Sequence, residues 1–153
     1  MRVALLNTMM PHIRGGAEIL VDDLAEQLQA YGHEVMLFRL PFPLSFEAPL
    51  VATIESARML CFDEFDRVIA FKFPAYCVKH QAKVIWMFHQ LRQVYDLWGK
   101  EYGLQPGPIG ESIKNIVTAA DDEDIPRSRH IYTNSLEVAN RLKKFNDIAA
   151  QVL

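Results

Sequence analysis

The sequence predicts an α/β fold in which a doubly wound, mainly parallel sheet forms a single domain over residues 1–153. Short apolar runs alternate with stretches of helical periodicity at about 30 residues per unit, which is the spacing of βαβ units. The apolar runs are unbroken rather than alternating, as expected of parallel strands that are buried on both faces. With 153 residues, of which 50% are apolar, the chain is long enough to bury one sizeable core.

The first βαβ unit shows these signals most clearly. Residues 3–6 form an unbroken apolar run and predict the first strand. From Gly16 the pattern becomes helical, because a leucine recurs at every fourth position over 20–28 and so marks one face. Gly32 is expected to end this helix in the left-handed conformation that closes many helices.

The remaining elements follow the same alternation. Further strands are expected at 34–40, 66–71, 84–88 and 130–133. Helices are expected at 46–62, 91–98, 109–120 and 136–145, with a short helix or turn at 74–80. Leu136 follows the apolar period of the last helix, and the acidic residues 121–124 are predicted to form a solvated helix end. Another apolar run begins at Ala149.

Composition and charge exclude several classes of function. The formal net charge is −3 and no run of like charges reaches five residues, so a basic groove for nucleic acid is not supported. The apolar run near the N-terminus is too short for a signal peptide or a membrane span. Lys143 and Lys144 are too few basic residues to argue for membrane attachment, which leaves membrane contact open.

The cysteines and histidines point to no metal or redox chemistry. Cys61 and Cys77 are expected to be free thiols packed as small hydrophobes, which favours a reducing, cytoplasmic setting. The histidines show no metal-ligand spacing and the pattern C-x-x-C is absent. We therefore expect no metal site and no cofactor.

Polar and basic side chains follow the predicted strands at their carboxyl ends, where doubly wound sheets bind ligands. These positions are Asn7, Thr8, Arg14, Gly15, Gly16, Arg39, Lys72, His89, Gln90, Arg92, Tyr95, Thr133, Asn134 and Ser135. Arg92 and Tyr95 are spaced so that they share one face of the helix expected at 91–98. Because the strand interiors stay apolar, the pattern predicts a crevice for an anionic or polyhydroxylated ligand.

Two of these positions have competing interpretations. Gly15 and Gly16 open a helix, where backbone N–H groups and the helix dipole can receive a phosphate or a sugar hydroxyl. The same pair fits a tight turn that requires positive φ, and it matches neither the dinucleotide nor the P-loop fingerprint. His89 is either a substrate-facing imidazole that bonds a hydroxyl or shuttles a proton, or a structural histidine satisfied by a nearby backbone carbonyl.

An ordered set of motifs resembles the N-terminal half of retaining glycosyltransferases of family 4, which have the two-domain GT-B architecture. The motifs include Gly-Gly-Ala-Glu after the first strand and Trp-Met-Phe-His-Gln-Leu-Arg around the fourth. They lie at 15–18, 32–35, 72–76, 86–92, 95–99, 133–135, 138–139, 141–142 and Asn146. Taken in order, they span essentially the whole chain.

The resemblance implies a Rossmann-like, acceptor-side domain of an enzyme that transfers a sugar from a nucleotide-diphosphate sugar to an unknown acceptor, with retention and without an obligatory metal. It implies that Gly15 and Gly16 lie against the donor phosphates and the acceptor, and that His89 lies near the transferred sugar as the candidate catalytic residue. The candidate substrate-binding set also holds Arg14, Lys72, Arg92, Tyr95, Asn134 and Ser135. Family members carry the nucleotide-sugar pocket on a second domain, which we expect this sequence to lack, so the chain alone is predicted to be inactive.

Two other classes of function compete with this interpretation. A non-catalytic Rossmann-like binding or assembly module that acts with a partner chain fits the same fold. A second Rossmann domain encoded downstream would favour the transferase. A nicotinamide oxidoreductase is disfavoured because G-x-G-x-x-G is absent. A domain that is separated from its partner domain exposes the apolar surface that faced it. The apolar residues Met9, Met10, Phe42 and Phe73 in the rim loops therefore predict concentration-dependent self-association or crystal contacts through this rim.

Overall fold

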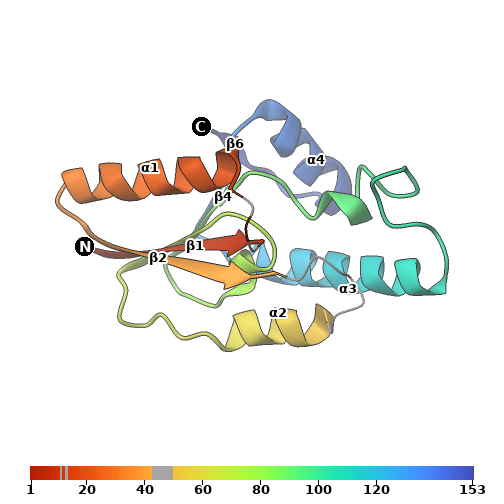
Figure 1. Ribbon diagram of the computed structural model, residues 1–153, viewed down its shortest axis with the longest axis horizontal. Helices are drawn as coiled ribbons and strands as arrows, with labels where there is room; N and C mark the ends of the chain where they lie inside the picture. Colours follow the sequence, from red (N-terminus) through yellow and green to blue (C-terminus); the bar gives the residue numbers. More distant parts are fainter. Residues whose placement is uncertain (11, 13, 43–49) are drawn as a thin grey trace.

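A parallel sheet organises the computed structural model, which describes residues 1–10, 12, 14–42 and 50–153 (Figure 1). Within these residues the sheet has six strands in the order β2-β1-β3-β4-β5-β6. The strands are β1 (Arg2–Met9), β2 (Glu34–Pro41), β3 (Arg67–Ala70), β4 (Lys83–Met87), β5 (His130–Thr133) and β6 (Gln151–Val152). All of the strand pairs are parallel, so the predicted α/β class with a doubly wound sheet is confirmed.

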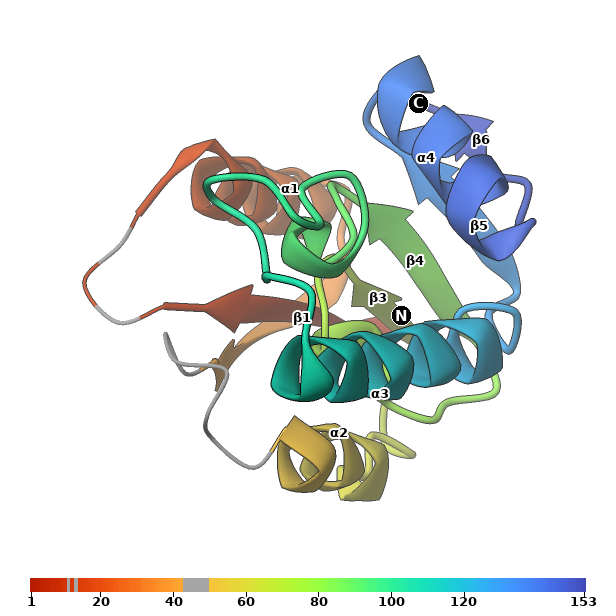
Figure 2. The ribbon, with the colours of Figure 1, turned by 90° about the vertical axis from the view of Figure 1, so that its right-hand side faces the viewer.

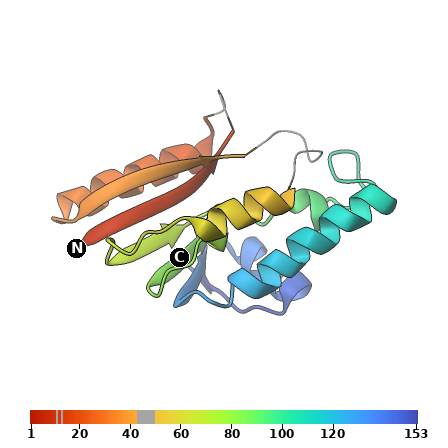
Figure 3. The same cartoon turned by 90° about the horizontal axis from the view of Figure 1, so that it is seen from below.

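Helices cover both faces of this sheet, as the views in Figures 1 and 3 show. The helices are α1 (Gly16–Ala30), α2 (Leu50–Met59), α3 (Pro108–Asp124) and α4 (Leu136–Asn146), with single 3₁₀ turns at η1 (Ala75–Cys77) and η2 (Arg92–Val94). In β1, Val3 and Leu5 pack in a cluster with α1, whereas Ala4 and Leu6 pack in the cluster that holds residues of α2, α3 and α4. These β1 side chains are at most 2% exposed, which explains the unbroken apolar run of this strand.

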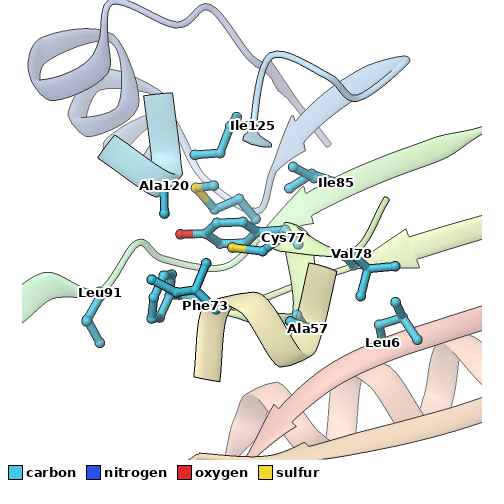
Figure 4. Close-up of a cluster of buried hydrophobic side chains, with 14 of the residues drawn as sticks. Leu6, Ala57, Phe73, Cys77, Val78, Ile85, Leu91, Ala120 and Ile125 are labelled. Carbon is cyan, nitrogen blue, oxygen red and sulfur yellow. The ribbon is translucent and has the colours of Figure 1, made fainter. Parts of the chain in front are cut away.

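The larger cluster is centred on the short turn η1, between the sheet and the helices α2 and α3. Cys77 and Val78 are fully buried. In Figure 4 they lie among side chains from β1, α2, β4 and α3 and from the residue after α3, namely Leu6, Ala57, Ile85, Ala120 and Ile125. The thiol of Cys77 therefore behaves as predicted, as a small buried hydrophobe. Cys61 does not: it follows the end of α2 and is exposed.

Several predicted elements keep their place but change their extent. The leucine stripe of α1 packs on the sheet, and Gly32 has φ of +83°, so both expectations for the first unit are confirmed. The helix predicted at 46–62 is observed as α2 over 50–59, while 43–49 lie outside the described residues. The apolar run predicted from Ala149 becomes the short strand β6. Leu136 was placed on an apolar face, but it is 66% exposed because Val138, Ala139 and Leu142 turn towards the core instead.

The helix predicted at 91–98 is wrong. Only η2 is helical there, and Tyr95 leaves helical geometry at φ −115° and ψ −103°. The chain then folds back on itself, with Gly99 N–H donating to the Leu104 carbonyl. A Cβ on Gly103 would lie 1.7 Å from the Leu97 carbonyl oxygen, so this close approach of two backbone segments requires glycine.

The acidic run was predicted to be solvated, but two of its carboxylates are fully buried. Asp121 accepts hydrogen bonds from the hydroxyls of Tyr76 and Tyr95, each at 2.7 Å. Asp124 accepts from the guanidinium of Arg58 at 2.7 and 2.9 Å. Asp121 and Asp124 lie on the same face of α3 as Ile113 and Val117, and this face packs against the core. The helical period therefore puts both carboxylates in the interior although they are charged residues.

The rim residues that were expected to promote self-association are largely buried in the structure. The rings of Phe42 and Phe73 are 5% and 4% exposed and pack edge to face with centroids 5.9 Å apart. Met9 and Met10 are half-buried. The rim thus exposes less apolar surface than predicted, and self-association stays a prediction.

The buried Asp121 gives the first testable prediction. Burial, together with the neighbouring Asp122 and Asp124, raises the pKa of Asp121 to about 7, against the lowering effect of the two tyrosine hydroxyls. Between the unfolded pKa of about 4 and the folded value, the folded state binds more protons, so this residue makes stability fall as pH rises. Replacing Asp121 with Asn should remove this slope, which reaches about 1.4 kcal/mol per pH unit.

The measurement is urea unfolding of wild type and Asp121→Asn at intervals between pH 4.5 and pH 7.5. We expect the difference in unfolding free energy between the two proteins to shift in favour of the variant as pH rises. Asp63→Asn, at an exposed position outside the helices, is the matched control and should show no such trend. Parallel stability curves for wild type and Asp121→Asn would refute the prediction.

Candidate functional site

A pocket of about 290 Å³ lies at the carboxyl ends of β1, β3 and β4, beside the first turn of α1. The first crossover runs from β1 to β2 at one edge, and the later strands extend the sheet in the other direction, so the topological switch lies between β1 and β3. In Figure 1 the start of α1 lies close to the arrowhead of β1. The residues that line the pocket are Thr8, Met10, Gly15, Gly16, Ala17, Glu18, Phe42, Lys72, Phe73, His89, Gln90, Leu91 and Gln93.

An ion pair between Glu18 and Lys72 forms the charged part of the pocket. The Lys72 ammonium lies 2.6 Å from Glu18 Oε1, and Glu18 Oε2 accepts the backbone N–H of Gly15 at 2.9 Å. Burial alone would raise the pKa of Glu18, but these two donors lower it below its ordinary value. The carboxylate is therefore charged near neutral pH, and it holds Lys72, from the end of β3, against the first turn of α1.

The glycine pair does not form the tight turn that was the competing interpretation. Gly15 has φ of −119° and Gly16 is the first residue of α1, so neither needs a positive φ. The first helical hydrogen bond runs from the Ile19 N–H to the Gly15 carbonyl. The N–H groups of Gly16 and Ala17 come before it in the chain, so the helix itself provides no acceptor for them. No atom lies within 4 Å of the place where a Cβ on Gly16 would stand, which leaves this side of the helix start open.

His89 follows β4 and keeps part of its ring exposed at the pocket. Its Nδ1 lies 2.8 Å from the backbone carbonyl oxygen of Gln90, so Nδ1 carries the proton and Nε2 is the acceptor. Desolvation by the surrounding protein, with the positive charges of Lys72 and Arg92, lowers the pKa of His89 despite this carbonyl. The imidazole is thus neutral near pH 7. His89 therefore has features of both interpretations. Its Nδ1 is bonded to a backbone carbonyl, as in a structural histidine, and its side chain also lines the pocket.

The wall next to His89 is oriented by a chain of hydrogen bonds. Asn146, at the end of α4, donates from Nδ2 to Asp122 at 2.7 Å and to the Tyr95 hydroxyl at 3.3 Å. Its carbonyl oxygen therefore faces Gln90, which donates to it from Nε2. Because the Gln90 amide nitrogen is used in this way, its Oε1 is the atom of this pocket-lining side chain that can still accept a hydrogen bond.

The other predicted site residues lie elsewhere and do not line the pocket. The Arg14 side chain is exposed and pairs with Asp22 at 3.0 Å. Arg92 pairs with Asp96 at 2.8 Å, and Tyr95 is buried with its hydroxyl on Asp121. Asn134 is exposed at the end of β5, and the Ser135 hydroxyl caps α4 by accepting the Val138 N–H at 3.4 Å. The structure brings together Gly15, Gly16, Lys72 and His89.

Sequence reasoning missed Glu18 as a pocket residue. The signal was present, because a glutamate three residues after the N-cap residue, here Gly15, commonly accepts the backbone N–H of that residue. The apolar lining of the pocket, formed by Met10, Phe42, Phe73 and Leu91, was not predicted as such, because the first three were expected in rim loops that promote self-association. These residues come from four separate loops, and only the folded chain brings them together.

The Glu18–Lys72 pair yields the second prediction. Replacing Glu18 with Gln leaves the half-buried Lys72 ammonium without its partner, so we expect a loss of about 1–3 kcal/mol in unfolding free energy at pH 7. Because the pKa of Glu18 is lowered in the folded state, its contribution is present above its unfolded pKa and is lost as pH falls through the folded value. The cost of Glu18→Gln should therefore shrink in acid.

Urea unfolding at pH 7 and pH 3 checks both points, with the exposed Glu26→Gln on the same helix as control. Equal stability of the two variants at pH 7 would contradict the assignment.

The comparisons with known proteins add no assignment to this site. The chain matches no protein-family model, and a search of curated proteins finds no significant match. Over residues 1–10, 12, 14–42 and 50–153, no three histidine, cysteine or acidic side chains gather as a metal site would require. In the same ranges, no helix is long and apolar enough to cross a membrane.

Proposed function

We propose that this chain is the acceptor-binding half of a retaining glycosyltransferase of GT-B architecture, which uses a nucleotide-diphosphate sugar as donor. The observation that carries the proposal is the mixed chemistry of the strand-end pocket. Hydrogen-bond donors and acceptors face each other there over an apolar floor, at the topological switch where doubly wound sheets bind ligands.

The polar groups of the pocket fit a ligand rich in hydroxyls. Lys72 and the N–H groups of Gly16 and Ala17 donate, while the Glu18 carboxylate and Gln90 Oε1 accept. A sugar hydroxyl is both donor and acceptor, so one ring can use both kinds of group. A volume of about 290 Å³ suits a single ring better than a dinucleotide.

The apolar side of the pocket supports the same ligand class. The rings of Phe42 and Phe73 stand in the floor together with Leu91. The faces of a sugar ring are lined by C–H groups, and these bury favourably against apolar and aromatic side chains. A bare phosphate would gain nothing from this floor.

The balance of charge in the pocket supports placing the sugar, rather than the diphosphate, on this half. Lys72 and Glu18 neutralise each other, so the pocket holds no surplus ammonium for two phosphates. The first turn of α1 still offers N–H groups and a partial positive charge, which can meet the near end of a diphosphate held by a second domain. In this arrangement His89 accepts a hydrogen bond at Nε2 from a sugar hydroxyl and so orients the ring.

The third prediction concerns the chain by itself. Because it supplies only the acceptor side, we expect no sugar transfer and a dissociation constant for nucleotide-diphosphate sugars in the millimolar range, about −4 kcal/mol. Isothermal calorimetry with uridine and guanosine diphosphate sugars measures this. Micromolar binding of either donor to this chain would contradict the assignment to an acceptor half. Catalytic transfer by this chain would contradict it as well.

The fourth prediction concerns His89 in a chain that joins this domain to a nucleotide-sugar domain. His89→Ala should keep the melting temperature, since a partly exposed side chain leaves no core cavity. It should lose about 2–4 kcal/mol of transition-state stabilisation in kcat/KM. His130→Ala is the control, because this exposed histidine begins β5 at the opposite end of the strands.

A lower melting temperature of His89→Ala with unchanged turnover per folded molecule would show that His89 is a structural histidine. Absence of transfer in the wild-type two-domain protein would favour the non-catalytic module.

A further inference from the structure

A second depression, of about 760 Å³, lies away from the strand-end pocket and shares no lining residue with it. It is formed by the segment 94–100 that follows β4, by α3 and by α4. Figure 2 shows α3 and α4, the two helices that contribute to it. We call it the lysine groove, defined by Trp98, Lys100, Lys114, Arg141, Lys144 and Phe145.

The lysine groove is lined by more positive than negative side chains, namely Lys100, Lys114, Arg141 and Lys144 against Asp96 and Glu137. Its acidic side chains, Asp96 and Glu137, are both engaged by guanidinium groups: Asp96 by Arg92 at 2.8 Å, and Glu137 by Arg141 at 3.1 Å. In the described part of the chain, Lys100, Lys114 and Lys144 form no ion pair. Three lysines from three separate elements thus line one concavity, in a protein whose formal net charge is −3.

Lysines gathered around one concavity create a positive field that attracts anions. Like charges that share a groove repel each other, and low-dielectric walls strengthen the field that they create. The same field concentrates anions at the groove.

Aromatic rings hold two of the lysines in place. The Lys114 ammonium lies 4.4 Å from the centroid of the Trp98 ring, and the Lys144 ammonium lies 5.1 Å from that of Phe145. The Trp98 ring in turn contacts the start of α3, since its Cη2 would lie 3.3 Å from a Cβ on Gly110. Cation–π contacts leave the N–H donors of an ammonium free for an anion, so the groove is preorganised without being neutralised.

We propose that the lysine groove binds a small organic phosphate, with the phosphate among the three lysine ammonium groups and the organic part along Trp98 and Phe145. Phosphate is the chemistry that several convergent ammonium groups recognise best, as point charges with multiple donors. The concave shape, closed by three elements, fits a small molecule rather than a flat surface. The proposal does not depend on the function proposed for the strand-end pocket.

The protein supplies its own reporter for a test. Its two tryptophans are Trp86 and Trp98. The indole Nε1 of Trp86 is buried without a hydrogen-bond partner in the described residues, so Trp86→Phe removes an unsatisfied donor and should leave the fold intact. The fluorescence of this variant then comes from Trp98 alone, beneath the Lys114 ammonium.

The experiment titrates Trp86→Phe with glucose 6-phosphate and, separately, with inorganic pyrophosphate. We expect a saturable change in Trp98 fluorescence that weakens as salt is added. Adding Lys114→Gln and Lys144→Gln together should weaken binding by about tenfold or more, since each removes a charge-assisted hydrogen bond. The matched controls, Lys79→Gln and Lys143→Gln, remove exposed lysines outside the groove and should bind as well as the parent.

Three results would overturn the proposal. They are a fluorescence that neither probe changes, equal affinity in the double lysine variant, and binding to vesicles of anionic lipid without binding of either soluble probe. If the double variant unfolds, Lys100→Gln alone serves, because Lys100 is exposed and lies outside the helices. Its affinity for glucose 6-phosphate should then fall by about tenfold if the proposal holds.

Discussion

Burial of β1 on both faces is the constraint on which the rest of the structure depends. This strand pairs with β2 on one side and with β3 on the other, and its interior side chains contact α1 on one face and the large core cluster on the other. A strand covered in this way can present polar groups only where it ends. Because all six described strands are parallel, the ends of β1, β3 and β4 meet at one edge, and the switch in crossover direction opens the pocket there.

A buried polar network then connects this pocket to the helical layer. The Asp121 carboxylate, on α3, receives the hydroxyls of Tyr76 and Tyr95, and Tyr95 is linked through Asn146 to the pocket residue Gln90. Satisfied networks of this kind fix side-chain orientation more firmly than apolar contacts do, since each donor and acceptor has one arrangement that leaves nothing unpaired. The orientation of the Gln90 side chain is therefore set by groups in α3 and α4.

The positions of the central strands could be predicted from the sequence, because a strand that is buried on both faces consists of a short, unbroken run of apolar residues. The runs at 3–6 and 84–88 gave the central strands within a few residues, and Lys72 and His89 followed as strand-end residues. Interactions between distant residues could not be predicted. Asp121 looks solvated in an acidic run, and nothing local shows that two tyrosines, 45 and 26 residues before it, donate to its carboxylate. Tyr95 was expected at the crevice for the same reason, since its buried hydroxyl partner was unknown.

In the function that we propose, the pairing of Glu18 with Lys72 decides what kind of ligand the pocket accepts. A free lysine beside a helix N-terminus would favour phosphate, whereas a neutralised one beside acceptors and apolar side chains would favour a hydroxylated ring. The most direct measurement is a crystal structure of the chain soaked with a uridine diphosphate sugar. Our account predicts density for the sugar ring between Lys72, Gly16 and His89, with the Glu18–Lys72 pair intact. Density for the diphosphate on Lys72 with Glu18 displaced, or a ligand bound only at the amino ends of the strands, would contradict it.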